Sequence, residues 1–387
     1  MSYVTASAPG KCILFGEHAV VYGEPAVAVA IDQRIKVKIQ PSQTGLWLLD
    51  GGDLNFTRNP HIAGLIDRLW ADDETLQPLS FQIEGNIPRA SGLGSSAALS
   101  TATAAALRMA KGRWLNAKGD GSNNNQWSEG YSSSIRETNP YTGSGYRENR
   151  EEQYAKKEFH LTGPKAVDID ECALLAHSVE ADAQNGRASP MDSSTCSHGG
   201  IVVISDKREA NIDWQYTRKM TTPEGVRTWE IHTMKPPEDD VYLVIGNTGI
   251  HAPTSRQVAN VAKMLEKNPK RFREIETIGR IARRGIAALI QGDYETVGRT
   301  MTENHLMLQS IGVSSPELDN LIKAAAPTAL GAKLTGAGGG GCMIALTRDP
   351  KLTSDAIELA GGRTLITRLG STGVSIDQYE GIPFANN

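Results

Sequence analysis

The run PRASGLGSSAA, from Pro88 to Ala98, is the most informative part of this sequence for its fold. It joins an apolar stretch, Leu79 to Ile87, that is typical of a strand to an alanine-rich stretch, Ala97 to Ala110, that is typical of a helix. A glycine and serine loop that opens a helix presents unpaired backbone N–H groups and the positive end of the helix dipole. The run therefore predicts a phosphate site, and the alternative is a glycine turn with a serine N-cap.

This loop departs from the two commonest nucleotide-binding motifs. A Walker A loop has a lysine directly after its last glycine, whereas Ser95 follows Gly94 here. A dinucleotide-binding fold has a third glycine where its helix packs on the strand, and GLGSSAA has none there. The sequence therefore predicts a phosphate cradle outside the P-loop and Rossmann classes.

Length and composition set broad limits on the function. A chain of 387 residues is long enough for two domains with large cores. The net charge of −4 gives no electrostatic reason to expect nucleic acid, and no apolar run suggests a membrane segment or a signal peptide. The cysteines are Cys12, Cys172, Cys196 and Cys342, and they form no CxxC pair. We therefore expect reduced thiols in a cytoplasmic protein, without nucleic acid or membrane partners.

A polar stretch from about residue 111 to 165 interrupts the pattern of apolar residues. It is rich in glycine, asparagine and serine, and it carries a charged run from Arg147 to Glu152. Such a composition does not bury enough apolar surface to offset the entropy lost on ordering. We interpret it as an insertion that forms a mobile surface loop, with a partner-docking element as the alternative.

The rest of the chain mixes strands and helices without the regular alternation of a doubly wound sheet, which predicts an α+β fold. Strands are expected at Val27–Ile39, Leu46–Leu49, Phe81–Ile87, Ile201–Ser205, Val241–Gly246, Cys342–Leu346 and Val374–Asp377. Helices are expected at His61–Trp70, Ala97–Ala110, Val167–Gln184, Ser255–Glu266, Arg271–Ile290, Tyr294–Gly312 and Pro316–Ala325. The segment Ala188–Gly200 is expected to be a loop.

Two further runs add to the phosphate prediction. SAPGKCILFGEHAVVYG spans Ser7 to Gly23, and KLTGAGGGGC spans Lys333 to Cys342. Together with GLGSSAA they resemble the signature motifs of the GHMP kinase superfamily. The first run is similar in wording to the mevalonate kinases within that superfamily. The resemblance covers most of the chain outside the polar stretch.

The resemblance implies a two-domain fold with the active site in the cleft between the domains. Residues 1–215, with the insertion, would form an N-terminal domain similar to ribosomal protein S5 domain 2, and residues 216–387 a ferredoxin-like α+β domain. The implied activity is ATP-dependent phosphorylation of mevalonate on its primary C5 hydroxyl, in the supply of isoprenoid precursors. The enzyme would be a monomer or homodimer. A phosphomevalonate kinase (with Arg89 and Arg187 facing the extra phosphate), another small-alcohol kinase and a non-catalytic ligand-binding homologue are the alternatives.

The resemblance also implies which residues hold ATP and Mg²⁺. The expected ATP contacts are Pro88, Ala90, Ser91, Gly92, Leu93, Gly94, Ser95, Ser96, Ala97, Thr335, Gly336 and Gly338. The Thr335 hydroxyl would donate to a phosphate oxygen. Mg²⁺ prefers hard oxygen ligands, and the resemblance places these at Ser96 and Glu180, with Asp182 as the alternative acid.

Lys11 and Asp192 are the expected catalytic residues. Asp192 follows a turn that contains Pro190, and the resemblance makes it the base that accepts the proton of the attacking hydroxyl. An aspartate that only shapes the turn is the alternative. Lys11 would contact both Asp192 and a phosphate oxygen, where a cation offsets developing negative charge. The expected substrate contacts are Lys11, Glu17, His18, Asp192 and Ala337.

Overall fold

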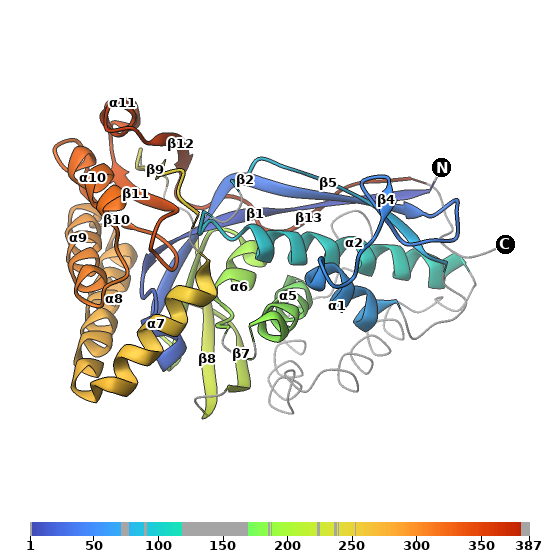
Figure 1. Cartoon of the computed structure of the whole chain (residues 1–387), viewed down its shortest axis with the longest axis horizontal. Helices are drawn as coiled ribbons and strands as arrows, with labels where there is room; N and C mark the ends of the chain where they lie inside the picture. The colour runs from blue at the N-terminus through green and yellow to red at the C-terminus, as the bar shows by residue number, and fades with distance from the viewer. Residues whose placement is uncertain are drawn as a thin grey trace.

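The protein was analysed as a computed structural model that describes residues 2–70, 77–88, 91–117, 169–184, 186, 188–222, 225–235, 238, 240–251 and 253–380 (Figure 1). Residues 111–117 are described by their backbone alone. Most of the expected insertion lies outside the described residues, as do Ala90, Arg89 and Arg187. Within the described part, no helix is long and apolar enough to cross a membrane.

Nine of the described strands form one large sheet, and Figure 1 shows β1, β2, β5 and β13 along the upper side of the molecule and β7 and β8 extending downward. They are β1 (Tyr3–Phe15), β2 (Ala26–Pro41), β3 (Leu48–Leu49), β4 (Gly52–Asp53), β5 (Leu79–Gly85), β6 (Ile201–Ser205), β7 (Asp213–Thr222), β8 (Gly225–Met234) and β13 (Ser375–Glu380). The order is β4-β3-β5-β2-β6-β8-β7, and β1 pairs antiparallel with both β2 and β13. The last strand of the chain therefore returns to the first.

Within the described residues, four helices accompany this sheet: α1 (Pro60–Leu69), α2 (Ser95–Ala117), α5 (Ile169–Ala183) and α6 (Met191–His198). Figure 1 shows α1, α2 and α5 together below the sheet. α2 is the central helix, and its small side chains allow close packing on its neighbours. Ala97, Ala98, Ala102, Ala104, Ala105 and Ala106 are all fully buried. The alanine-rich sequence thus places the start of α2 deep in the molecule.

A second, four-stranded sheet of order β10-β11-β9-β12 lies at the other end of the molecule (Figure 1). Its strands are β9 (Tyr242–Asn247), β10 (Gly331–Leu334), β11 (Cys342–Thr347) and β12 (Arg363–Arg368). The helices of this part are α7 (Thr254–Lys267), α8 (Phe272–Gln291), α9 (Tyr294–Ser310), α10 (Pro316–Ala325) and α11 (Pro350–Leu359), with short 3₁₀ helices η1 (Ala19–Tyr22) and η2 (Pro269–Arg271). All strand pairs in this sheet are antiparallel.

The expected strands and helices are present, with one exception that matters for the site. The loop expected at Ala188–Gly200 is wrong, because residues 191–198 form α6. This helix carries serine, threonine and cysteine in place of an apolar stripe, and Ser193, Thr195 and Cys196 are nevertheless fully buried. Tertiary packing decides its structure. The sequence did not predict β1, β4, the β7–β8 hairpin, β10, α11 or β12.

The division between residues 215 and 216 stays a prediction. That point falls within β7, and the strands before and after it, β6 and β8, pair with each other in one sheet.

Candidate active site

A cavity of about 460 Å³ lies where the three sequence motifs meet. Its lining includes most of the residues expected from the sequence: Lys11, Glu17, His18, Ser91, Gly92, Leu93, Gly94, Ser95, Ser96, Glu180, Asp192, Gly336 and Ala337. The first strand, the start of α2, the helices α5 and α6 and the loop after β10 all contribute to it. Segments more than 300 positions apart in the chain therefore share one cavity.

The glycine loop before α2 takes a conformation that suits glycine. Gly92 and Gly94 have φ angles of +80° and +74°, in the left-handed region that L side chains rarely adopt. A Cβ atom on Gly92 would also lie 3.1 Å from the carbonyl oxygen of Thr335. The glycines therefore let the phosphate loop and the third motif pack backbone to backbone. The N-terminus of α2, at Ser95, opens onto the cavity.

Lys11 is buried on β1 and joins two motifs. Its Nζ lies 3.1 Å from Oδ2 of Asp192 and donates to the carbonyl oxygen of Gly92 at 3.1 Å. Burial lowers the pKa of Lys11, but the Asp192 carboxylate outweighs burial, so the pKa lies above its ordinary value. Lys11 is therefore a fixed positive charge between the phosphate loop and Asp192.

Asp192 lies in the first turn of α6, directly after the cap residue Pro190 and Met191. A carboxylate is favoured at this end of a helix because the unpaired N–H groups carry partial positive charge. The Asp192 side chain is 34% exposed, whereas that of Lys11 is 3% exposed. The Asp192 carboxylate thus faces the cavity while it is ion-paired with the buried Lys11.

Glu180 projects from α5 into the same cavity and is 4% exposed. Burial, and then the negative charge of Asp192, raise the pKa of its carboxyl well above the ordinary value. The carboxylates of Glu180 and Asp192 repel each other in this cavity, and a bound cation would stabilise the ionised form of both. The hydroxyl of Ser96 lines the cavity as well, so hard oxygen donors suited to Mg²⁺ come together here. Asp182, the alternative acid, is instead ion-paired with Arg68.

The described residues contain no cluster of three or more His, Cys, Asp and Glu side chains that could hold a metal ion. Mg²⁺ in kinases is bound through one or two carboxylates together with substrate phosphates. Ser96 and Glu180 fit that kind of site.

Glu17 has a structural partner that the sequence analysis missed. Its carboxylate forms an ion pair with the ammonium of Lys333, and it accepts a hydrogen bond from Nδ2 of Asn304 at 3.1 Å. Lys333 is fully buried in β10 and also donates to the carbonyl oxygen of Ile13. Glu17 thus ties the turn after β1 to β10, and its direct contact with substrate stays a prediction. Lys333 begins the third motif, but no role was predicted for it, because a lysine usually lies at the surface.

His18 and Thr335 form further links between the first and third motifs. His18 has a φ angle of +62°, and its Nε2 lies 2.9 Å from the carbonyl oxygen of Ala337. Burial lowers the pKa of His18, so the neutral ring donates this bond. Thr335 is buried, and its hydroxyl oxygen accepts the N–H of Ile13 at 2.8 Å. That hydroxyl therefore supports β1, and the phosphate contact expected for it stays a prediction.

The remaining expected residues of the described part do not line the cavity; they are Pro88, Ala97, Thr335 and Gly338. Ala90 is outside the described part of the chain. Several lining residues were not expected: Ile13, Val20, Val21, Leu99, Gln184, Ala188, Ser189, Met191, Thr254 and Val258. Most are apolar or small, and no contact was predicted for them although Ile13, Val20 and Val21 belong to the first motif.

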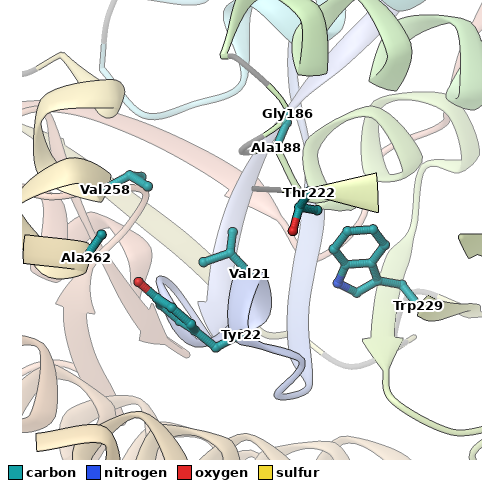
Figure 2. Close-up of a pocket in the computed structure, with 8 residues that line it drawn as sticks. All are labelled: Val21, Tyr22, Gly186, Ala188, Thr222, Trp229, Val258 and Ala262. Carbon is teal, nitrogen blue, oxygen red and sulfur yellow. The ribbon is translucent and has the colours of Figure 1, made fainter. Parts of the chain in front are cut away.

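A small apolar pocket adjoins the cavity. Figure 2 shows Val258 and Ala262 of α7 on one side, Trp229 on the other, and Val21 and Tyr22 between them. Val21, Ala188 and Val258 line both spaces. One side of the active cavity is thus apolar.

Comparison with known proteins places these features in context. Two family models match the chain: "GHMP kinases N terminal domain" over residues 61–128 and "GHMP kinases C terminal" over residues 286–359. The mevalonate kinase of Methanothermobacter thermautotrophicus is 31% identical over 88% of this chain and 89% of its own length. That of Archaeoglobus fulgidus is 30% identical over 89% and 93%. A structure of L. major mevalonate kinase in complex with R-mevalonate has a TM-score of 0.60 at 23% identity, with 94% and 95% coverage, and shows likeness of fold.

Proposed function

Because this chain belongs to the mevalonate kinase family of GHMP kinases, we propose that its cavity receives mevalonate beside the phosphates of ATP. The enzyme catalyses the ATP-dependent phosphorylation of mevalonate on the C5 hydroxyl, with 5-phosphomevalonate as product. Family membership also confirms the predicted α+β GHMP kinase fold. The residue roles below are our proposal.

The ion pair between Lys11 Nζ and Asp192 Oδ2, at 3.1 Å, carries the proposal. It lies in the wall of the cavity that the start of α2 also reaches. Asp192 is exposed enough for a hydroxyl to approach, and we infer that its carboxylate accepts the C5 hydroxyl proton. As the proton leaves, the alcohol oxygen forms a bond to the γ-phosphorus and the bond from that phosphorus to ADP breaks.

Lys11 and the phosphate loop would stabilise the negative charge that shifts during the transfer. Lys11 is held between the Gly92 carbonyl oxygen and Asp192, so its charge is already in place before the reaction. Preorganised charge of this kind costs no reorganisation at the moment of reaction. The N–H groups at the start of α2 would bind the β- and γ-phosphates.

Mg²⁺ would be held by the Ser96 hydroxyl and the Glu180 carboxylate, which both line the cavity. When bound, Mg²⁺ neutralises charge between the β- and γ-phosphates. His18 and Ala337, joined at 2.9 Å, would form part of the wall around mevalonate. All four cysteines are buried and none is in a disulfide bond, which suits the cytoplasmic location predicted from the sequence.

The substrate is tested by an ADP-release assay with mevalonate, phosphomevalonate, galactose and homoserine side by side. We expect mevalonate to give the highest kcat/KM, by at least about tenfold, which corresponds to roughly 1.4 kcal/mol of transition-state discrimination. Equal or higher efficiency with phosphomevalonate would refute the proposal and favour the sister activity.

The base is tested by Asp192→Asn, which keeps the size of the side chain and removes its basicity. General-base catalysis is worth roughly 10²–10⁴-fold, so kcat is expected to fall by about that factor while KM for ATP changes little. Asp182→Asn is the matched control, because Asp182 pairs with Arg68 outside the cavity lining. A near-normal kcat in Asp192→Asn would remove Asp192 from the mechanism.

A further inference from the structure

His177 lies on α5, three positions before Glu180, and is completely buried. Its ring nitrogen Nδ1 receives the Nε–H of Arg218, a β7 residue, at 3.0 Å. Since arginine Nε is always a donor, Nδ1 carries no proton, and the neutral ring holds its proton on Nε2. Burial, and then the charge of Arg218, lower the pKa of His177 to about 3, so the ring stays neutral at physiological pH. Arg218 thus selects one tautomer.

The Nε2–H of His177 donates to the carbonyl oxygen of Ala188 at 3.0 Å. Ala188 lines the cavity and precedes Asp192 by four positions. Only Ser189, Pro190 and Met191 lie between them, and α6 begins at Met191. The imidazole, which does not line the cavity, therefore fixes by a hydrogen bond the backbone of the turn that leads from Ala188 to Asp192.

Trp229 of β8 supports the same arrangement. Its ring meets His177 edge-on, with centroids 6.2 Å apart and planes at 88°. Its Nε1–H donates to the carbonyl oxygen of Val20 at 3.1 Å. Figure 2 shows Trp229 below Ala188, beside the pocket that Val21 also lines. His177 and Trp229 thus hydrogen-bond to the backbone of two residues that line the cavity, Ala188 and Val20.

We propose that His177 is a positioning residue for phosphoryl transfer: it fixes the Ala188 carbonyl and thereby the turn that presents Asp192 to Lys11 and the substrate. This inference rests on the base role proposed for Asp192. Neither His177 nor Arg218 is among the residues that line the cavity, so the effect passes through the backbone. A misplacement of about 1 Å at a reacting group costs on the order of 10²-fold in rate.

Two amide variants separate this role from a general effect on the core. In His177→Gln the amide nitrogen falls near the place of Nε2, so the donor to Ala188 is kept. In His177→Asn it falls near Nδ1 and does not reach Ala188. We expect kcat of His177→Asn to lie at least about tenfold below that of His177→Gln, with KM for ATP nearly equal. Equal kcat values in the two variants, measured where circular dichroism shows both folded, would overturn the proposal.

The matched control is His232→Asn. His232 is a fully buried β8 histidine outside the cavity lining, and its Nε2 accepts the N–H of Glu209 at 3.0 Å. This variant is expected to lower Tm but to keep kcat. A kcat loss equal to that of His177→Asn would mean that core destabilisation is the cause, and the proposal fails.

Further variants complete the test. If His177→Asn does not fold, Arg218→Gln replaces it in the test. This variant keeps His177 but removes the Nε–H donor that fixes the proton of His177 on Nε2. An unchanged kcat in Arg218→Gln would count against the proposal. A normal kcat in Asp192→Asn would remove the proposed base itself. An impaired Asp192→Asn with equal His177 variants would remove the role of His177 alone.

Discussion

The buried ion pair between Lys333 and Glu17 gives the sharpest prediction about stability. Both side chains are almost completely inaccessible, at 0% and 1% exposure. Lys333→Met keeps the length of the side chain and removes the ammonium. The Glu17 carboxylate then loses its ion-pair partner and keeps the hydrogen bond from the neutral amide of Asn304, at 3.1 Å. Removing one partner of a buried pair costs about 3–5 kcal/mol, because the other charge stays buried without compensation. That is a large part of a typical folding free energy of about 5–15 kcal/mol.

The loss in Lys333→Met is expected to depend on pH. Burial already raises the pKa of Glu17, and the Lys333 charge is the largest effect that opposes it. Without Lys333 this pKa rises further above the unfolded value of about 4.3. A group whose pKa is raised by folding stabilises fully below its unfolded pKa, and the stabilisation is lost as pH rises through the folded pKa. Lys333→Met is therefore expected to lose more stability at pH 8 than at pH 5.

Urea unfolding followed by circular dichroism measures both effects. The free energy of unfolding is compared for the wild type, Lys333→Met and the double variant Glu17→Gln/Lys333→Met at pH 5 and pH 8. The double variant removes both charges and is expected to recover about half or more of the loss, since replacing a whole buried pair is often nearly neutral. A loss below about 1 kcal/mol at pH 8, or a double variant as unstable as the single one, would refute the reasoning.

Three further predictions concern the metal, the phosphate loop and a thiol. Glu180→Gln keeps the shape and removes the charge, so the Mg²⁺ concentration for half-maximal activity is expected to rise at least about tenfold, with Asp182→Asn as control; an unchanged Mg²⁺ dependence would exclude Glu180 as ligand. In Gly94→Ala the new Cβ would lie 2.9 Å from Lys11 Cγ at a φ of +74°, so kcat is expected to fall in the steady-state assay, and a normal kcat would show that Lys11 need not be held there. Burial raises the pKa of Cys342 to about 12, so little reactive thiolate forms at pH 8. Mass spectrometry after iodoacetamide treatment of the native protein at this pH is expected to find Cys342 unmodified. Rapid alkylation would contradict its buried placement.

The phosphate loop shows how far local sequence reasoning reaches. Gly92 and Gly94 were recognisable because positive φ angles and exposed N–H groups are properties of a short segment. The strand before it and α2 after it follow from their apolar and alanine patterns. α6 did not follow in this way, because Met191–His198 has no helical stripe and is stabilised by burial on all sides. The acid in its first turn, Asp192, was found through its motif.

The motifs were enough to predict the chemical groups of the site: a glycine loop for phosphate, a lysine, and carboxylates for a base and a metal. Which of these groups face the cavity, and which build its walls, depends on the tertiary fold. Glu17 and Lys333 are 316 positions apart, and only the approach of β1 to β10 makes them a buried pair. Likewise, Arg218 of β7 and His177 of α5 are 41 positions apart, and only the fold brings them within hydrogen-bond distance. The physical reason is that the free energy of a buried charge depends on its partners, and partners distant in sequence are set by the fold.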